Sequence, residues 1–337
     1  MNRVIGGAGK GDSIVVKRVE VEKGGGPEVM RLVECDLAAP GPGMVRVAMR
    51  AIGLNYIDTY HRSGLYPLPL PTGLGLEGAG VVEDVGEGVE LAVGARVAFC
   101  AAGIGTYSEA MLLPEARVVE LPDAIDFETA AAVFLKGATV EYLLRRCFAL
   151  QAGQQTLFHA AAGGVGQLFG QWAKALGAEL IGTVSTPAKR ELALANGYAH
   201  CLLSGSDDVV AHVREISGGA MLPVVYDGVG AATFSESLDS LAPRGLMVSF
   251  GNASGPPPAF DLQELANRGS LYITRPSLLA YVATTAELRD CASAVFERVL
   301  DGTLRVSIDQ RYPLEDVQQA HRDLESRRTT GSTLLLP

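Results

Sequence analysis

The stretch from Thr156 to Leu176 reads T-L-F-H-A-A-A-G-G-V-G-Q-L-F-G-Q-W-A-K-A-L. It begins with a short apolar run, Thr156–Phe158, which is typical of a buried strand. After several small residues, apolar side chains recur at the spacing of one face of an amphipathic helix: Val165, Leu168, Phe169, Trp172 and Leu176. The stretch therefore predicts a strand, a glycine-rich turn and a helix.

The turn of this unit is Ala160–Gly166. A helix N-terminus presents unpaired N–H groups and the positive end of the helix dipole, and glycines let a phosphate come close to the backbone. We interpret the turn as the binding site for the pyrophosphate of a dinucleotide. Its spacing, with Ala160, Gly163 and Gly166, departs from the usual G-x-G-x-x-G, so a turn that only packs tightly on a neighbouring helix is the alternative.

Composition restricts the class of protein. A chain of 337 residues suggests two domains, and 48% hydrophobic with 20% charged residues is typical of a globular protein. The net charge of −10 argues against the basic patch that nucleic-acid binding requires. No apolar run approaches the length of a membrane span, and the glycine-rich N-terminus lacks the apolar centre of a secretory signal.

The cysteines point to a reducing compartment. No two of them lie within four residues of each other, so neither a metal-ligand pair nor a dense disulfide framework is visible. We expect buried thiols and a cytoplasmic protein. The five are Cys35, Cys100, Cys147, Cys201 and Cys291.

The first part of the chain, Ile14–Val119, consists of short β-branched runs separated by turn residues, which predicts an all-β barrel or folded sheet. One polar interruption, Asn55–Tyr60, stands out within it. A helix is expected to begin at Asp126, because an acidic residue is favoured at a helix N-terminus.

The second part alternates between strands and helices, which is typical of a parallel sheet covered by helices on both faces. We expect strands at Thr156–Phe158, Glu179–Val184, Val224–Tyr226, Leu246–Phe250 and Leu271–Thr274. We expect helices at Gly137–Ala149, from Val165, and at Pro187–Ala195, Asp207–Ile216, Ala232–Leu241, Leu262–Ala266 and Thr285–Leu300. The tail, with a strand at Arg305–Ile308, a helix at Val317–Leu324 and a strand at Thr333–Leu336, is expected to complete the sheet of the first domain.

The end of the second strand of such a fold indicates the coenzyme. An acid there accepts hydrogen bonds from the adenosine ribose and selects NAD, whereas it would repel a 2′-phosphate. After Val184 the chain instead offers two hydroxyls at Ser185 and Thr186, a helix N-terminus, and the cations Lys189 and Arg190. These groups suit a dianionic phosphate, so the sequence predicts NADPH rather than NADH.

With these residues in place, the chain resembles the medium-chain dehydrogenase/reductase superfamily, and within it the zeta-crystallin-like NADPH:quinone oxidoreductases. The resemblance covers almost everything from Val15 to Pro337. It is carried by Gly53–Tyr66, by the Ala160–Gly166 turn, by Val248–Asn252 and by Thr274–Leu278. It implies a GroES-like catalytic domain of residues 1–136 and 284–337, with 1–14 as a loose extension, and a Rossmann-type NADPH-binding domain of residues 137–283. It also implies a cleft between the two domains and a homodimer.

The resemblance implies roles for single residues. Tyr56, Ile57, Asp58, Thr59 and Tyr60 would line the nicotinamide and its ribose. Gly163, Gly164, Val165 and Tyr142 would meet the diphosphate, and Ser185 and Lys189 would hold the 2′-phosphate. Gly251, Asn252 and Leu278 would flank the nicotinamide, and Arg327 would reach a phosphate. One position departs from the family: Ser204 stands where a tyrosine often contacts the adenine, so that contact is in doubt.

Zinc-dependent relatives need a thiolate within the segment that here reads Asn55–Asp58 and a histidine where this chain has Leu76, in Gly75-Leu76-Glu77. Leucine cannot bind a metal, and no clustered cysteines exist for a structural zinc. We therefore expect no metal site. Without a Lewis acid, the electron acceptor must itself be ready to take hydride, as a quinone or an activated enone is.

Four residues are candidates for the catalytic centre. Asn55 is expected to donate a hydrogen bond to the acceptor or to the nicotinamide ribose, with a capped turn as the alternative. Tyr60 can donate and stack. Asp58 can position its neighbours, accept from a ribose hydroxyl, or form only a local backbone bond. Tyr66 can cover the pocket or simply pack.

The sequence thus predicts an NADPH-dependent, zinc-independent quinone reductase that transfers hydride or single electrons to quinones. A reductase of enone or alkenal double bonds is the nearest alternative. The alternative of another class is a crystallin-like structural or RNA-binding protein. A further alternative is a coenzyme-binding sensor with feeble catalysis. The expected partners are a small quinone or enone and a second copy of the chain, with no nucleic acid and no membrane span.

Overall fold

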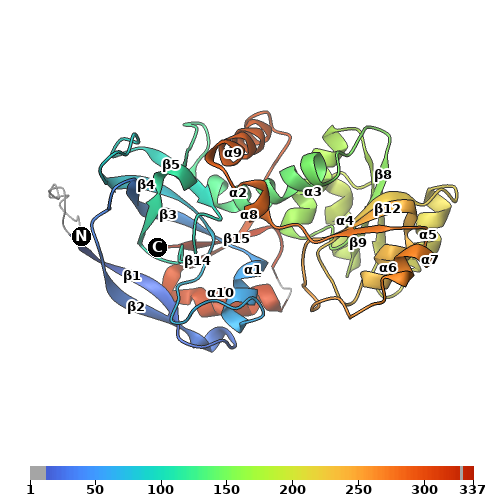
Figure 1. The fold of residues 1–337 in the computed structure, drawn as a ribbon, viewed down its shortest axis with the longest axis horizontal. Coiled ribbons are helices and arrows are strands. Elements are labelled where there is room, and N and C mark those ends of the chain that lie inside the picture. Colours follow the sequence, from blue (N-terminus) through green and yellow to red (C-terminus); the bar gives the residue numbers. More distant parts are fainter. Residues whose placement is uncertain (1–12, 327–328) are drawn as a thin grey trace. The chain divides into compact units, whose positions relative to one another are not determined.

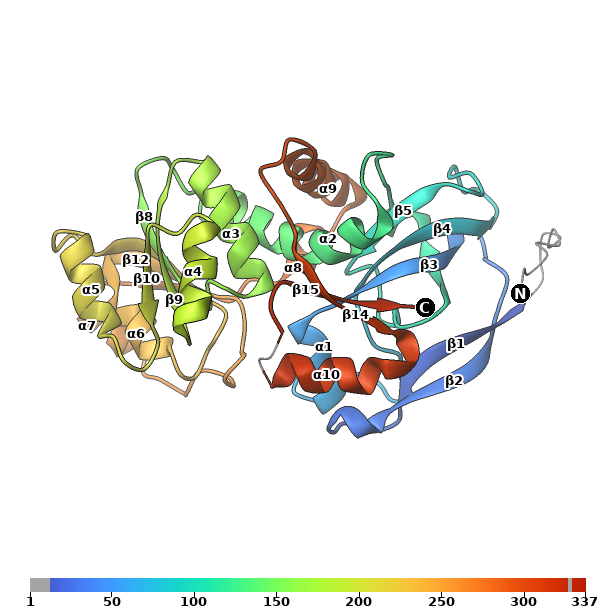
Figure 2. The same cartoon turned by 180° about the vertical axis from the view of Figure 1, so that it is seen from behind.

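The computed structural model describes residues 13–326 and 329–337. The chain divides into two compact units, one formed by the described residues up to Leu135 together with Val306–Pro337, and the other by Lys136–Arg305. Each unit has its own sheet (Figure 1, Figure 2). The division differs from the expected one at its second boundary, because helix α9 (Thr285–Leu300) belongs to the second unit, whereas residues from 284 onwards were assigned to the first domain.

The first unit is built around a seven-stranded sheet of order β14-β15-β3-β4-β5-β7, with β6 paired to β3. A separate antiparallel pair is formed by β1 (Ile14–Val21) and β2 (Met30–Leu37). The sheet consists of β3 (Met44–Leu54), β4 (Glu77–Val85), β5 (Arg96–Cys100), β6 (Ala110–Pro114), β7 (Val119–Glu120), β14 (Ile308–Pro313) and β15 (Ser332–Leu336). Short 3₁₀ turns lie at η1 (Pro27–Val29), η2 (Glu115–Arg117) and η4 (Leu314–Asp316).

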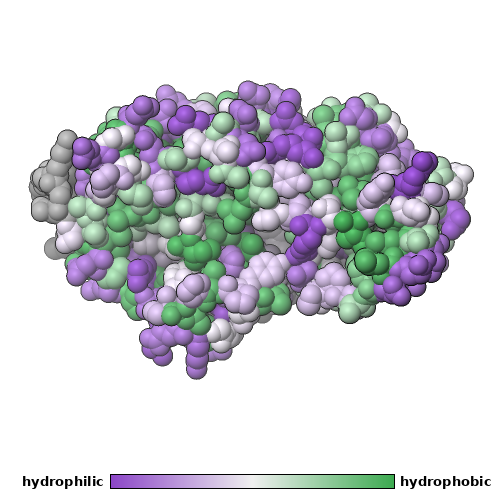
Figure 3. Space-filling model, in the orientation of Figure 1, coloured by the Kyte–Doolittle hydropathy of each residue, from purple (hydrophilic) through white to green (hydrophobic). Residues whose placement is uncertain are grey.

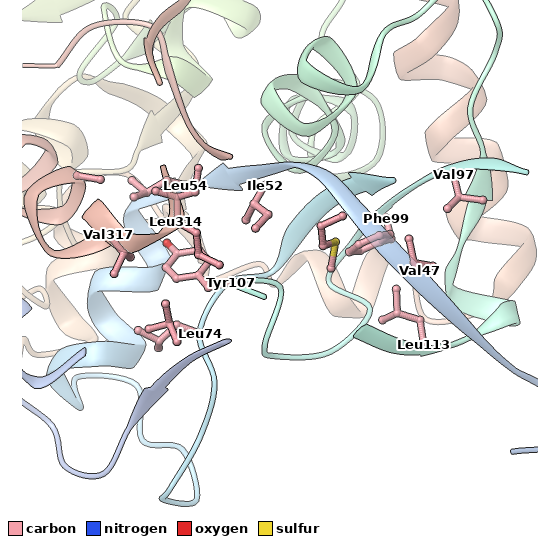
Figure 4. Packing of buried hydrophobic residues seen from close by; sticks show 14 of the residues in the cluster. Val47, Ile52, Leu54, Leu74, Val97, Phe99, Tyr107, Leu113, Leu314 and Val317 are labelled. Carbon is pink, nitrogen blue, oxygen red and sulfur yellow. The ribbon is translucent and has the colours of Figure 1, made fainter. Parts of the chain in front are cut away.

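The C-terminal tail completes this sheet, as expected. Strand β15 pairs antiparallel with β3, and Leu335 lies opposite Ile52. Strand β14, placed at Arg305–Ile308 from the sequence, begins only at Ile308. The apolar core of the unit joins β3 and β5 to the tail, and Figure 4 shows Ile52, Phe99 and Leu314 in this cluster.

Helix α1 (Tyr56–Ser63) corrects the expectation that no helix interrupts the strands of the first part. Asn55 and Asp58 form a capping box at its start, and Gly64 ends it in the left-handed conformation with φ of 84°. The interruption Asn55–Tyr60 is therefore a capped helix. Helix α10 (Val317–Glu325), in the returning tail of this unit, lies at the expected place.

The second unit has a six-stranded sheet of order β10-β9-β8-β11-β12-β13, in which every pairing is parallel. Numbered along the chain, this order is 3-2-1-4-5-6, the Rossmann order, with its switch point between β8 and β11. The strands are β8 (Gln155–Phe158), β9 (Glu179–Val184), β10 (His200–Leu203), β11 (Leu222–Asp227), β12 (Leu241–Ser249) and β13 (Tyr272–Thr274). Strand β10 was not predicted.

Helices pack on this sheet: α3 lies against β9, α4 against β9 and β10, and α6 against β11 and β12 (Figure 1). The helices are α3 (Gly164–Ala175), α4 (Pro187–Ala195), α5 (Val209–Ile216), α6 (Phe234–Asp239), α7 (Gln263–Asn267) and α8 (Leu278–Tyr281). The separate run expected at Gly137–Ala149 is instead the continuation of one helix, α2 (Phe127–Tyr142), followed by the π-helical turn η3 (Leu143–Cys147).

None of the helices within residues 13–326 and 329–337 combines the length and the apolar character that crossing a bilayer requires.

Candidate active site

The predicted coenzyme residues of the second unit gather at one edge of its sheet. Carboxyl ends of parallel strands meet at the same edge, and ligands of open α/β folds bind there, at the switch point. The turn after β8 carries Gly163, Gly164 and Val165; Ser185 follows β9, Ser204 follows β10, Gly251 and Asn252 follow β12, and Leu278 begins α8 after β13. The topology therefore brings together residues that lie more than a hundred positions apart.

The glycine-rich turn at the end of β8 has the geometry that a phosphate site needs. Ala160 adopts a φ of 60°, and no side chain caps the N-terminus of α3. A Cβ on Gly166 would lie 2.7 Å from the Ala160 carbonyl oxygen and 2.6 Å from that of Ala161. The backbone is thus packed too tightly for a side chain at Gly166, and it leads into the N-terminus of α3, the kind of helix end at which N–H groups can bind an anion.

The end of β9 carries the groups predicted for the 2′-phosphate. Ser185 is exposed and Lys189 is half-buried on the first turn of α4, where the Thr186 hydroxyl caps the helix by accepting from the Lys189 N–H at 3.3 Å. The Arg190 guanidinium instead forms an ion pair with Asp207, with 3.1 Å between its Nη2 and Asp207 Oδ2. Of the two cations in this segment, Lys189 is therefore the better placed for a phosphate.

Ser204 lies beside this segment, since its N–H donates to the Val184 carbonyl at 2.8 Å. The side chain is exposed. A hydroxyl of this size offers no ring surface to an adenine. The structure thus supports the proximity of Ser204 to the predicted ribose site but gives it no stacking partner.

Asp227, which sequence reasoning missed, is the buried carboxylate at the end of β11. Its Oδ1 accepts from the N–H groups of Val229 and Gly230 at 2.8 and 3.0 Å, and its Oδ2 accepts from the Ser237 hydroxyl at 2.7 Å. The loop it holds packs directly on Gly251, where a Cβ would collide with the carbonyl of Gly228. Asp227 therefore shapes the edge on which Gly251 and Asn252 lie.

His159 is fully buried at the end of β8, which agrees with a packing role rather than a metal ligand. Its Nδ1 lies 3.0 Å from Thr183 Oγ1, and the Thr183 carbonyl accepts from the Ala161 N–H at 2.9 Å. Burial lowers the pKa of His159, and the Asp227 carboxylate opposes this only in part. A neutral His159 ties the glycine-rich turn to the end of β9.

Tyr142, predicted to meet the diphosphate, ends α2. Its ring stacks on Tyr281 with 4.6 Å between centroids and 10° between planes, and burial raises its pKa. The Arg146 guanidinium covers the ring of Tyr281 at 5.4 Å. The diphosphate contact stays a prediction. Arg327, the other predicted phosphate contact, lies outside the described residues.

In the first unit, the predicted residues surround helix α1. Asn55 is its N-cap, and the Asn55 N–H donates to Asp58 Oδ2 at 2.9 Å. The amide nitrogen Nδ2 of Asn55 donates to Glu77 Oε2 at 2.8 Å and, more weakly, to the Gly53 carbonyl at 3.4 Å. Both N–H bonds of this amide are therefore directed into the unit. The Asn55 side chain also accepts from the Asp58 N–H in the capping box, and the donor role expected of it toward an acceptor or a ribose stays a prediction.

Glu77 is the residue that orients this amide, and its role could not be inferred from the sequence. Its carboxylate is completely buried, and its Oε1 accepts from the Leu135 N–H at 2.6 Å. The carboxylate and the Ala131 carbonyl fill the space where a Cβ on Gly53 would lie. Glycine at position 53 thus makes room for the charge that holds Asn55.

Aromatic rings extend from α1. The centroid of Tyr60 lies 5.5 Å from that of Tyr56 and 5.0 Å from that of Tyr66, and the Tyr66 N–H donates to the Tyr60 carbonyl at 3.1 Å. The Thr59 hydroxyl donates to the Tyr56 carbonyl at 2.7 Å, so this hydroxyl stabilises the helix itself. The side chain of Ile57 is half-buried. The three tyrosines form one aromatic cluster on this unit, in which Tyr60 is buried and Tyr56 and Tyr66 are half-buried.

Asp58 is fully buried within its unit, where its Oδ2 also accepts from the Tyr107 hydroxyl at 2.8 Å. The same hydroxyl oxygen, Tyr107 Oη, also lies 3.1 Å from Nε2 of His321 in α10. Asp58 is therefore placed to position α1 and Asn55. Tyr107 and His321 carry no local motif and lie 49 and 263 positions along the chain from Asp58, so nothing in the sequence pointed to them.

Within the described ranges, no group of three or more histidine, cysteine, aspartate or glutamate side chains is arranged to hold a metal ion. All five cysteines are unpaired thiols. At the two positions where zinc-dependent relatives need their ligands, this chain has the Asn55–Asp58 cap and the apolar Leu76.

Known proteins are similar to this chain over nearly its whole length. A family model described as "Alcohol dehydrogenase GroES-like domain" matches residues 41–123, and one described as "Zinc-binding dehydrogenase" matches residues 164–292. The quinone oxidoreductase of Pseudomonas aeruginosa is 52% identical over 325 residues, which are 96% of this chain and 100% of that protein. The 2-haloacrylate reductase of a Burkholderia species is 40% identical over 332 residues, 96% of this chain and 99% of that protein.

A solved structure agrees. The quinone oxidoreductase of Escherichia coli, complexed with NADPH, superposes with a TM-score of 0.94 at 49% identity, covering 95% of this chain and all of that one. The two family models together include α1, within residues 41–123, and the end of β9, within residues 164–292. With this identity and coverage, the chain belongs to the quinone oxidoreductases, a family of the medium-chain dehydrogenase/reductase superfamily.

Proposed function

We propose that this protein is an NADPH-dependent, zinc-independent quinone reductase, which transfers hydride or single electrons to quinones. The observation that carries the proposal is the end of β9, where Ser185 and Lys189 stand and no carboxylate occurs within Ser185–Arg190. The similar Escherichia coli quinone oxidoreductase was solved with NADPH. When bound, NADPH supplies the hydride.

The residues of the second unit would hold the coenzyme in three places. The N–H groups of Gly164 and Val165 would donate to the diphosphate, beside the tight backbone at Gly163. The Ser185 hydroxyl and the Lys189 ammonium would bind the 2′-phosphate. At the other side of the switch point, Gly251, Asn252 and Leu278 would flank the nicotinamide, with Gly251 held against Gly228.

The residues of the first unit would orient the reacting groups. Asn55 Oδ1 would accept from a ribose hydroxyl, because its Nδ2 is engaged by Glu77. The rings of Tyr56, Tyr60 and Tyr66 would stack on a flat acceptor, which suits a quinone. Residue 76 is leucine and the Asn55–Asp58 segment has no cysteine, so the residues offer no zinc site, and the acceptor must be reactive without a Lewis acid.

The test is NADPH consumption with benzoquinone, naphthoquinone, phenanthrenequinone and 2-alkenals, with NADH measured in parallel. We expect turnover of at least one quinone, with a lower KM for NADPH than for NADH. Equal KM values for the two coenzymes would remove the argument from the end of β9. A wild-type protein that turns over no acceptor above background would end the enzyme proposal in this form.

A second candidate function is reduction of an activated carbon–carbon double bond, favoured by the similar 2-haloacrylate reductase. It would use the same coenzyme residues and needs only a different acceptor beside the cluster of Tyr56, Tyr60 and Tyr66. The two functions differ in their product. Product analysis with 2-haloacrylate and 2-alkenals would show a saturated compound if the second function holds, with little quinone turnover.

We further propose a cytoplasmic homodimer that does not bind nucleic acid. Strand β13 is one edge of its six-stranded sheet; Tyr272 in this strand and Leu279 in α8 are 61% and 58% exposed. Figure 3 shows apolar surface on the unit that carries β12 and α7. An open strand edge with exposed apolar side chains suits a second copy, and light scattering of wild type and of Tyr272→Lys would test this, the variant being expected to dissociate.

A structural or RNA-binding role remains the alternative of another class. The net charge of −10 disfavours the long basic surface that RNA requires. The five free thiols suit a reducing compartment. A gel-shift assay with and without NADPH would decide, since the proposal expects no shift in either condition.

A further inference from the structure

A chain of buried polar side chains runs behind helix α1 in the first unit. Asp58 accepts from Tyr107, Tyr107 contacts His321, and the Nδ1 of His321 lies 3.0 Å from Arg62 Nη1. Arg62 in turn donates to both oxygens of Glu325, at 3.0 and 2.6 Å. The members come from α1, from the loop before β6, and from α10, three segments that are far apart in the sequence.

The hydrogen bonds of this chain can run in only one direction. A guanidinium has donors and no acceptor, so His321 Nδ1 must accept from Arg62. A neutral ring then carries its proton on Nε2 and donates to Tyr107 Oη. The Tyr107 hydroxyl, having accepted, donates to Asp58 Oδ2, which also receives the Asn55 N–H. Every link therefore depends on the one before it.

Burial keeps these protonation states in place. Asp58, Tyr107 and His321 are fully buried, and Arg62 is 2% exposed. Burial, with the Arg62 charge beside it, lowers the pKa of His321 to about 3, so the ring is neutral. Burial and the Asp58 carboxylate raise the pKa of Tyr107, so its proton stays on the hydroxyl. Figure 4 shows the Tyr107 ring among Leu74, Leu314 and Val317.

The far end of this chain is Asn55. Its backbone N–H is held by Asp58, while its amide is held by Glu77 from another direction. We propose that Tyr107 and His321 are positioning residues for the reduction: they fix Asp58, and through it they fix the orientation of Asn55 at the start of α1. The proposal rests on the role proposed above for Asn55. It assigns no contact between Tyr107 or His321 and coenzyme or acceptor.

The decisive experiment is a double-mutant cycle in the full-length protein, with Tyr107→Phe and Asn55→Ala made singly and together. If Tyr107 acts through Asn55, Tyr107→Phe lowers kcat for the quinone about tenfold in the wild-type background, the effect of one lost hydrogen bond to a charged group. In the Asn55→Ala background the same change lowers kcat less than about twofold, because the group being positioned is gone. Because Asn55 is proposed to accept from a ribose hydroxyl of the coenzyme, the KM for NADPH rises in Tyr107→Phe as well, and again less so in the Asn55→Ala background.

A matched control removes a similar hydrogen bond that does not lead to α1. The Tyr312 hydroxyl donates to Asp323 of α10 at 2.8 Å, in the same unit. Tyr312→Phe is expected to leave kcat within about twofold of wild type, because no link to Asn55 is broken. If Tyr312→Phe lowers kcat as far as Tyr107→Phe does, the effect is one of general stability and the proposal is wrong.

His321 provides a second, independent series. A glutamine at 321 can accept from Arg62 and donate to Tyr107, whereas leucine can do neither. We expect His321→Gln to retain kcat within about threefold and His321→Leu to lose about tenfold. If the two variants, both folded by thermal melting, lose activity equally, the direction of the hydrogen bonds is not what matters and the proposal fails. This series also serves if Tyr107→Phe does not fold.

The outcomes separate this proposal from the function on which it rests. A wild-type protein without quinone or enone turnover contradicts the proposed function, and NADPH binding measured by fluorescence then shows whether the coenzyme site still stands. Wild-type turnover with an unaffected Asn55→Ala variant contradicts the positioning proposal alone. Equal fold-losses for Tyr107→Phe in both backgrounds contradict it as well, since Asn55 would then be irrelevant to the effect.

Discussion

Lys189 stands on the first turn of α4, half-buried, with its backbone N–H engaged by Thr186. Its neighbour Arg190 is paired with Asp207. Replacing Lys189 with alanine should weaken NADPH binding about tenfold or more, because a charge-assisted contact to phosphate is worth about 1.5–3 kcal/mol. NADH, which lacks the 2′-phosphate, should bind unchanged. Fluorescence titration with both coenzymes measures the difference.

Lys174, an exposed lysine on α3, provides the control. Lys174→Ala removes one positive charge from the same unit without touching the end of β9, so it should leave both affinities unchanged. A similar loss of NADPH affinity in both variants would indicate a general charge effect and would contradict the specific role of Lys189.

Glu77 shows how one buried charge can set the direction of a neighbouring amide. It accepts from the Asn55 amide and from the Leu135 N–H, so both of its oxygens face donors. In Glu77→Gln, the new NH₂ group must face one of these donors, which leaves a buried group unsatisfied. We expect a loss of about 1–3 kcal/mol in the free energy of unfolding and a lower kcat.

Urea-induced unfolding and steady-state kinetics measure these two effects of Glu77→Gln. Glu109→Gln is the matched control, because Glu109 also accepts from a backbone N–H, that of Lys17, but at the exposed surface. Its stability should change by less than about 0.5 kcal/mol. Unchanged stability and kcat in Glu77→Gln would show that Asn55 does not need the carboxylate.

At the scale of elements, periodicity located most of the second unit, and β9 and α4 begin and end at the expected residues. It failed where a short element has no periodic apolar face of its own. Helix α1 spans eight residues and is defined by its caps, Asn55 with Asp58 and Gly64, rather than by an apolar pattern. Strand β10 has four residues, and only its pairing with β9 makes it a strand.

The candidate site divides in the same way. Features formed by residues that are neighbours in the sequence, such as the glycines of Ala160–Gly166 or the missing acid directly after Val184, could be interpreted from the sequence because their chemistry is local. The engaged Nδ2 of Asn55 and the carboxylates of Glu77 and Asp227 could not, because tertiary packing alone decides which donors those groups face. Packing also directs the Nδ2 of Asn55, the expected donor, to the Glu77 carboxylate.

We expect coenzyme binding to depend on the glycine-rich turn. A Cβ on Gly166 would lie within 2.7 Å of two backbone carbonyl oxygens, which cannot move without displacing the turn, whereas one on Gly163 would lie 3.2 Å from a single carbonyl oxygen. We expect Gly166→Ala to weaken NADPH binding strongly, Gly163→Ala to weaken it less, and Gly41→Ala, where a Cβ meets no atom within 4 Å, to leave it unchanged. Titration of the three variants gives the order, and a Gly166→Ala protein with wild-type affinity would contradict it.

At the scale of the whole molecule, the first unit is completed by the last part of the chain. Helix α10 and strand β15 follow the entire second unit, yet they supply His321 and the strand that pairs with β3. The buried polar chain behind α1 therefore forms only after the tail has returned. The stability of the first unit and the arrangement of its candidate catalytic residues are tied to the same contacts.

This connection makes the stability of the protein depend on pH in a definite direction. The pKa of His321 is about 3 in the folded protein, against an ordinary value of 6.5. As the pH falls through about 6.5, the unfolded chain binds a proton at this histidine and the folded chain does not, so stability present at neutral pH is lost toward acid. The loss attributable to His321 should reach about 2 kcal/mol by pH 5.

Urea-induced unfolding of wild type and His321→Gln between about pH 7.5 and about pH 5 measures this contribution. His61 and His159, whose pKa values burial also lowers, destabilise both proteins equally in acid, so the difference between the two pH profiles isolates residue 321. The wild type should lose more stability than the variant across this window, because glutamine does not titrate. Parallel profiles would mean that His321 is as easily protonated in the folded protein as in the unfolded one, and Arg62 would then have no neutral acceptor to bind.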